Sequence, residues 1–360
     1  MDVDEDLPLV NQTSSAGATT PLDSQDASKS GSAVHMLLHS IITPSPYPHH
    51  NAGPTSARFR NALSRVLQRP EHDVEAWQAL LTEVTTCYKN IPNIHAVDAT
   101  TLAQLDWVES CFGNFLCHFP YAIHQGIVPL VTLLLHQSAR VGEPHGPVVD
   151  YYGGAVPKRA QICERKCTAL LQEYLGLANK TSGLSDPAAA GAGSEENDKS
   201  KTTINAMGSW VVELWLIYIQ KCTRDATRHA QTLPPEQRAA YIRDQTKEAY
   251  EAAIPECGFS INNHLLWTAY LEFSQSEYSP NQFSAGTAEH AAASQAQMVQ
   301  LRSVYQRLVT YPMTGLDQHW HAYEAWERTQ SEALAQALSQ EWTPKYQHAR
   351  TVYLERNRVL

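Results

Sequence analysis

Apolar and polar positions along most of the chain alternate with the period of an α-helix. Apolar and aromatic residues recur at three- and four-residue spacing, which places them on one helix face. Alternation at every second position is nearly absent, and no Asn-Gly or Asp-Gly pair marks a hairpin. The pattern therefore predicts an all-α fold.

Pairs of aromatic helices recur along this pattern. The first helix of a pair carries a Trp followed three residues later by a ring or a Leu, and the second carries a Phe or Tyr. Phe119-Pro120 and Tyr311-Pro312 stop two of the second helices. We expect these aromatic residues to form an inter-helix core rather than a ligand-binding ladder. The predicted repeat-core residues are Trp77, Phe112, Trp215, Tyr218, Tyr250, Trp267, Tyr270, Tyr305, Pro312, Trp320, Tyr323 and Tyr353.

Such a pair of helices cannot bury both of its apolar stripes alone. Stacked pairs complete the core, so the repeats predict a superhelix, or solenoid, with a concave face. One unit departs from the pattern, because residues 122–136 lack a Trp and contain Pro129.

Three segments interrupt the helical pattern. Residues 1–55 are rich in Ser, Thr, Pro, Asp and His, which predicts a mostly disordered acidic tail. Small and polar residues dominate at 178–208 and, more weakly, at 275–286, which predicts flexible insertions. The domain of about five repeat units is therefore expected to span residues 56–360.

Composition narrows the class of protein. Of the 360 residues, 43% are apolar, enough for a sizeable core, and 37 acidic against 27 basic residues give a net charge of -10. That balance argues against broad neutralisation of nucleic-acid phosphates. No apolar run approaches the roughly 20 residues of a membrane span. The acidic N-terminus is unlike a signal peptide, and the seven scattered Cys indicate reduced thiols of the cytosol or nucleus.

No catalytic motif stands out, so we expect neither an enzyme nor a cofactor. Phosphate-binding, nucleophile-elbow and HExxH patterns are missing from the sequence. The acidic pairs Asp106/Glu109 and Glu324/Glu327 are interpreted as solvated helix faces.

Two groups of possible metal ligands are interpreted as core or surface residues. Cys163 and Cys167 lie at i,i+4, and His319 and His321 flank Trp320. Zinc needs four converging ligands, and no second pair has a finger spacing.

Basic residues cluster modestly at two places. Lys158 and Arg159, and Arg356 and Arg358, are candidate contacts with RNA or a protein partner. Ordinary helix polarity, with Arg near helix ends, is the competing interpretation.

The Trp-x-x-Tyr helix followed by an Arg-x-x-Tyr helix resembles the HAT (half-a-TPR) repeat, which occurs largely in RNA-processing proteins. The C-terminal stretch resembles the suppressor-of-forked family, the large HAT subunit of cleavage stimulation factor. The matching features are VYQR at 304–307, Pro312-Met313, Asp317-Gln318, Trp320, Tyr323, Glu327, Leu334-Ala335, Tyr346, Ala349 and Arg350. The resemblance covers about 71–360 and is densest at 300–356.

This resemblance implies a nuclear, non-catalytic scaffold of the cleavage stimulation complex in pre-mRNA 3′-end cleavage and polyadenylation. Its implied partners are the RNA-recognition-motif subunit, the WD40 subunit and the polyadenylation specificity factor, with RNA bound mostly indirectly. The family's second HAT half, which dimerises, and its Pro-rich tail have no counterpart here. The chain is therefore expected to correspond to the N-terminal HAT half, as a fragment or a short form.

Other functions stay open at this point. A HAT scaffold of the U1 snRNP in splicing has similar repeats, and a TPR-like adaptor would need a carboxylate clamp of Lys and Arg. An all-α metal hydrolase would need paired His and acidic ligands on facing helices.

Overall fold

The computed structural model describes residues 56–91, 99–140, 155–177, 208–260, 262–277 and 288–359. The predicted tail at 1–55 lies outside these ranges, as does the predicted insertion at 178–208 apart from Gly208. Residues 275–277 of the third predicted break instead complete a helix. In this last turn Gln275 Nε2 donates a hydrogen bond to the Tyr305 hydroxyl at 2.7 Å, which ties the end of the helix to its neighbour.

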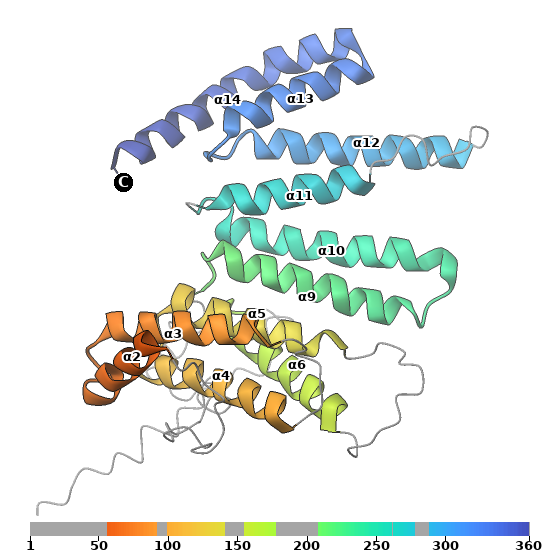
Figure 1. The fold of residues 1–360 in the computed structure, drawn as a ribbon. Helices are drawn as coiled ribbons and strands as arrows, with labels where there is room; N and C mark the ends of the chain where they lie inside the picture. Colours follow the sequence, from red (N-terminus) through yellow and green to blue (C-terminus); the bar gives the residue numbers. More distant parts are fainter. Residues whose placement is uncertain are drawn as a thin grey trace, which may run out of the picture.

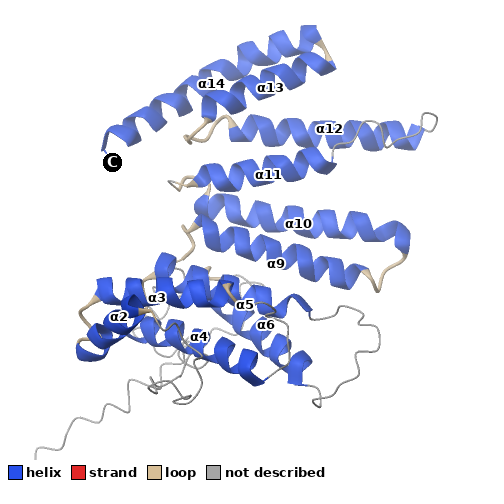
Figure 2. Cartoon of the chain, in the orientation of Figure 1, coloured by secondary structure: helices blue, strands red, loops and turns tan. Residues whose placement is uncertain are grey.

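All regular structure in the described ranges is helical (Figure 2). The α-helices are α2 (Ala57–Gln68), α3 (Val74–Lys89), α4 (Ala99–His118), α5 (Val128–Gln137), α6 (Ala155–Tyr174), α9 (Val212–Ala230), α10 (Pro235–Cys257), α11 (Asn263–Glu277), α12 (Ala288–Leu308), α13 (Leu316–Gln330) and α14 (Glu332–Val359).

The helices stack in the order of the sequence (Figure 1). Three pairs, α9/α10, α11/α12 and α13/α14, lie in successive layers above a base formed by α2 to α6. One continuous apolar core runs through the stack, from Phe59 in α2 to Ala349 in α14. The fold is therefore an all-α solenoid of HAT type, as the repeat pattern predicted.

The irregular unit is explained by its Pro and Gly. Pro129 lies in the first turn of α5, a position at which proline is tolerated. A single π-helical turn, Ile123–Ile127, precedes it. Within that turn Gly126 packs against Leu116, and a Cβ there would lie 2.5 Å from Leu116 Cδ2. Any larger residue at 126 would force the Leu116 side chain to shift.

Candidate functional site

Most of the predicted repeat-core residues are buried between helices. Tyr218 and Tyr353 are half-buried. The buried members of the set are Trp77, Phe112, Trp215, Tyr250, Trp267, Tyr270, Tyr305, Pro312, Trp320 and Tyr323.

Three of the repeat tryptophans also fix the turn that precedes their own helix. In each, the indole N–H donates to a backbone carbonyl of that turn, which satisfies a donor that burial would otherwise leave unpaired. These bonds join Trp77 to Pro70 (2.8 Å), Trp215 to Ser209 (2.7 Å) and Trp267 to Gly258 (3.4 Å). The tryptophans thus set how one unit follows the next.

Aromatic contacts join successive units. Tyr250 in α10 stacks on Tyr270 in α11, with ring centroids 4.8 Å apart. Tyr305 in α12 contacts Tyr323 in α13 in a tilted arrangement, with ring centroids 5.6 Å apart. These ring pairs make the array a continuous body rather than a set of independent hairpins.

The interpretation of the acidic pairs as solvated faces is wrong for Glu109 and Glu327. Glu327 is only 1% exposed and accepts two hydrogen bonds from Arg302 of α12, at 2.6 and 2.8 Å. Glu109 accepts from Arg159 (2.7 Å) and Lys166 (2.8 Å) of α6. Each carboxylate is thus neutralised by a basic residue from a neighbouring helix, and sequence spacing does not reveal such a partner.

A further ion pair connects three helices. Glu251 in α10 accepts hydrogen bonds from Tyr270 of α11 (2.6 Å) and from Arg307 of α12 (2.6 Å). Burial alone would raise the pKa of Glu251, but the hydrogen bonds from Arg307 and Tyr270 outweigh burial and lower it.

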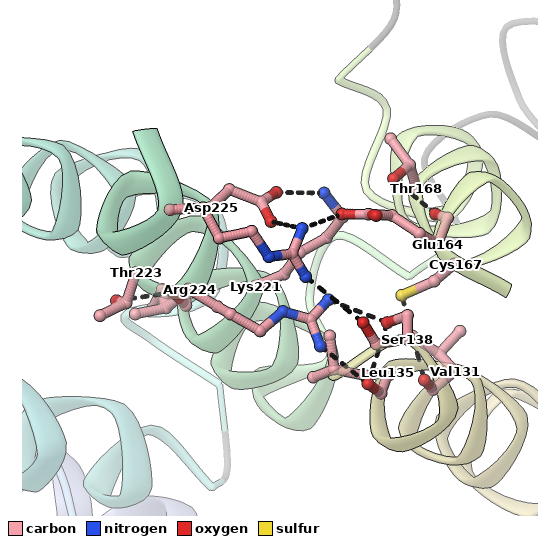
Figure 3. Close-up of polar contacts among 12 residues, drawn as sticks. Val131, Leu135, Ser138, Glu164, Cys167, Thr168, Lys221, Thr223, Arg224 and Asp225 are labelled. Atoms are coloured by element: carbon pink, nitrogen blue, oxygen red, sulfur yellow. Dashed lines mark hydrogen bonds and ion pairs between the residues drawn. The ribbon is translucent and has the colours of Figure 1, made fainter. Parts of the chain in front are cut away.

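Two arginines of α9 join the base of the array to the layers above it (Figure 3). Arg224 donates to Leu135 O (2.8 Å) and Ser138 Oγ (2.9 Å) at the C-terminal end of α5, where the helix dipole favours a cation. Arg228 pairs with Glu164 of α6 at 2.6 Å. Burial, together with the like charge of Arg228, lowers the pKa of Arg224. We call Arg224, Arg228 and the groups that they contact the junction cluster. Its contacts hold α9 against α5 and α6.

The structure does not bring the two predicted basic contact groups together. Lys158 and Arg159 belong to α6 in the base, whereas Arg356 and Arg358 lie near the C-terminal end of α14, which descends beside the layers below it (Figure 1). Arg159 is engaged with acidic residues of α4. Arg356 and Arg358 are exposed, and Arg356 donates to Phe259 O at 3.2 Å.

Cys163 and Cys167, weighed as metal ligands, are buried, and burial raises the pKa of each thiol to about 12. Within the described ranges no three His, Cys, Asp or Glu residues are grouped in a way that could hold a metal ion. Nor does that part of the chain contain a helix with the length and apolar character of a membrane span.

Three exposed aromatic residues lie at the boundaries between units, a feature that the spacing of residues in the sequence did not predict. Tyr121, Trp210 and Phe259 are 60%, 55% and 58% exposed, and each lies in the turn between one unit and the next. A cavity of about 500 Å³ opens between Trp210 and Phe259. The signal in the sequence was an aromatic residue within two residues of a Pro or Gly at the boundary between two units.

Comparison with known proteins gives matches in the C-terminal part of the chain. A family model described as suppressor of forked protein (Suf) matches residues 203–360, which contain the three layered pairs from α9 to α14. The mRNA 3′-end-processing protein RNA14 of Cryptococcus neoformans is 32% identical over 117 residues, 32% of this chain and 10% of that protein.

Two further relatives match with similar coverage. Cleavage stimulation factor subunit 77 of Arabidopsis thaliana is 30% identical over 35% of the chain and 16% of its own length. Protein suppressor of forked of Drosophila melanogaster is 22% identical over 40% of the chain and 16% of its own length. The matched stretch is thus a small part of each of these relatives. Residues 203–360, which have the helical-repeat fold, are thus similar to the suppressor-of-forked family.

Proposed function

We propose that the chain is a non-catalytic scaffold in the nuclear machinery that cleaves and polyadenylates pre-mRNA 3′ ends. The observation that carries this proposal is the match of α9 to α14 to the suppressor-of-forked family, some of whose members are named for 3′-end processing and cleavage stimulation. We take the HAT domain to span residues 56–360, with about five units.

The physical character of the array supports a scaffold. Successive units are joined by stacked rings, by the ion pair of Arg302 with Glu327 and by the junction cluster of α9. An array connected in this way keeps its binding surfaces in fixed positions relative to one another. Such rigidity suits a protein that positions other subunits. The net charge of -10 favours protein contacts over broad RNA contacts.

The proposed partners are a subunit with an RNA-recognition motif, a WD40 subunit and the polyadenylation specificity factor. The chain would then contact RNA mainly indirectly, through the subunit with the RNA-recognition motif. Contacts would come from exposed helix faces and turns, with little chemistry beyond surface complementarity.

The test is a pull-down from nuclear extract with the tagged full chain, read by quantitative mass spectrometry. We expect enrichment of cleavage and polyadenylation subunits over a tag-only control. A Trp267→Ala variant, which removes a buried ring from the same helices, should lose that enrichment. Recovery of U1 snRNP proteins instead would overturn the proposal in favour of a splicing scaffold.

A further inference from the structure

Three aromatic side chains at the boundaries between units are exposed to solvent. Tyr121, Trp210 and Phe259 are each more than half exposed, whereas the repeat tryptophans are buried. They lie outside the helices, just after α4, just before α9 and just after α10. Exposed rings that lie close together are typical of interaction surfaces.

The cavity of about 500 Å³ lies between two of these turns. Trp210 and Phe259 line its sides, with Val211 and Val212 between them, and the ring of His124 contacts that of Trp210 at a centroid distance of 5.9 Å. Rings and branched aliphatic side chains therefore make up most of this wall.

The two turns are fixed relative to each other before anything binds. Ser260 Oγ donates to Trp210 O at 2.6 Å, which ties the α10–α11 turn to the turn before α9. Arg356 of α14 donates to Phe259 O from outside the cavity. Because these contacts already fix the two turns, binding costs little conformational entropy of the cavity walls. A short ligand can therefore bind there.

The polar part of the cavity is acidic. Glu213 and Glu256 are the charged residues that line it, and Asn262 Nδ2 donates to Glu213 Oε1 at 3.3 Å. An acidic rim around aromatic walls attracts a cation and repels a phosphate backbone.

We propose that this cavity binds a short extended peptide segment of a protein partner that carries a Lys or Arg next to a Pro or an aromatic residue. The ring packs between Trp210 and Phe259, and the cation lies beside Glu213 and Glu256. Aromatic grooves bind Pro-rich segments in this way, and a cation also interacts favourably with a Trp face. The inference goes beyond the scaffold role and depends on the cavity alone.

The first experiment is a selection of phage-displayed random nonapeptides on the immobilised full chain. The Trp210→Ala variant is the counter-selection target, and because Trp210 is exposed we expect the variant to fold normally. We expect the recovered sequences to place Lys or Arg within one or two residues of Pro or an aromatic residue. No enrichment over the variant, or enrichment of acidic sequences, would overturn the proposal.

The second experiment measures affinity by fluorescence polarisation with the most enriched nonapeptide. We expect Trp210→Ala and the double variant Glu213→Gln/Glu256→Gln each to weaken binding at least about tenfold, and added salt to weaken it further. Tyr121→Ala is the matched control, because it removes an exposed ring from a turn outside the cavity, and it should leave binding unchanged.

Other occupants of the cavity give distinct results. A labelled U-rich single-stranded RNA that binds the chain and is lost in Trp210→Ala would assign the cavity to nucleic acid. A concentration-dependent dimer abolished by the same substitution would assign it to a second copy of the chain. Either result overturns the peptide proposal while leaving the pull-down result unaffected.

Discussion

The buried ion pair between α12 and α13 gives the sharpest test of how the units are held together. Glu327 is 1% exposed and receives two hydrogen bonds from Arg302. In Arg302→Met the carboxylate stays buried without that partner, and breaking a buried pair on one side costs about 3–5 kcal/mol. Removing both charges in Arg302→Met/Glu327→Met should restore most of that stability, because no charge is then left in the core.

The structure supplies a matched control for this change. Arg350 pairs with Asp317 between α13 and α14, but the two side chains are 50% and 52% exposed. Water screens such a pair, so Arg350→Met should cost about 0–1 kcal/mol. The two substitutions are chemically identical and differ in burial.

Amide hydrogen exchange is the appropriate assay, because repeat arrays can open unit by unit. A cost of about 3–5 kcal/mol corresponds to protection of the α12 and α13 amides falling by roughly 150- to 5,000-fold. Equal effects of Arg302→Met and Arg350→Met would refute the reasoning from burial. A double variant as unstable as Arg302→Met would refute it too.

Three other predictions concern stability. Trp267→Ala should cost about 3–5 kcal/mol, the range for large aromatic core truncations, and an unchanged thermal midpoint would contradict the core assignment. Gly315 has φ 77° and space for a Cβ, so Gly315→Ala should cost about 1–2 kcal/mol from backbone strain alone, and Gly315→Asn less, measured by urea unfolding. Burial, and then the neighbouring His264, lower the pKa of His319 from 6.5, so the folded state favours the neutral ring. Stability should therefore fall as the pH drops through about 6.5. Urea midpoints at about pH 7.5 and 5.5 should show a smaller loss for His319→Gln, and an equal loss would exclude His319 as the cause.

The folded chain shows how much of a helical repeat can be predicted from its sequence. The pairing of Trp with a ring three residues later located helices α9, α11 and α13, because one helix face must be apolar for the helix to pack. The resemblance of the C-terminal repeats to the suppressor-of-forked family was likewise visible in the residues, and the family model matches there.

The polar contacts between units could not be predicted in the same way. Glu109 and Glu327 have the spacing of solvated residues, yet the structure buries Glu327, partly buries Glu109 and pairs each with basic side chains of another helix. The candidate cavity was also missed, since Trp210 and Phe259 are far apart in the sequence and are joined only by the stacking of two turns.

Helix formation depends on neighbouring residues, so the sequence by itself determined the helices, their apolar faces and the need to stack. How each helix sits on the next depends on side chains remote in sequence, such as Arg224 against the end of α5. The tertiary structure therefore decided which carboxylates are buried, which rings stay in water and where a cavity opens between units. These features arise from the docking of units on one another, and no single unit contains them.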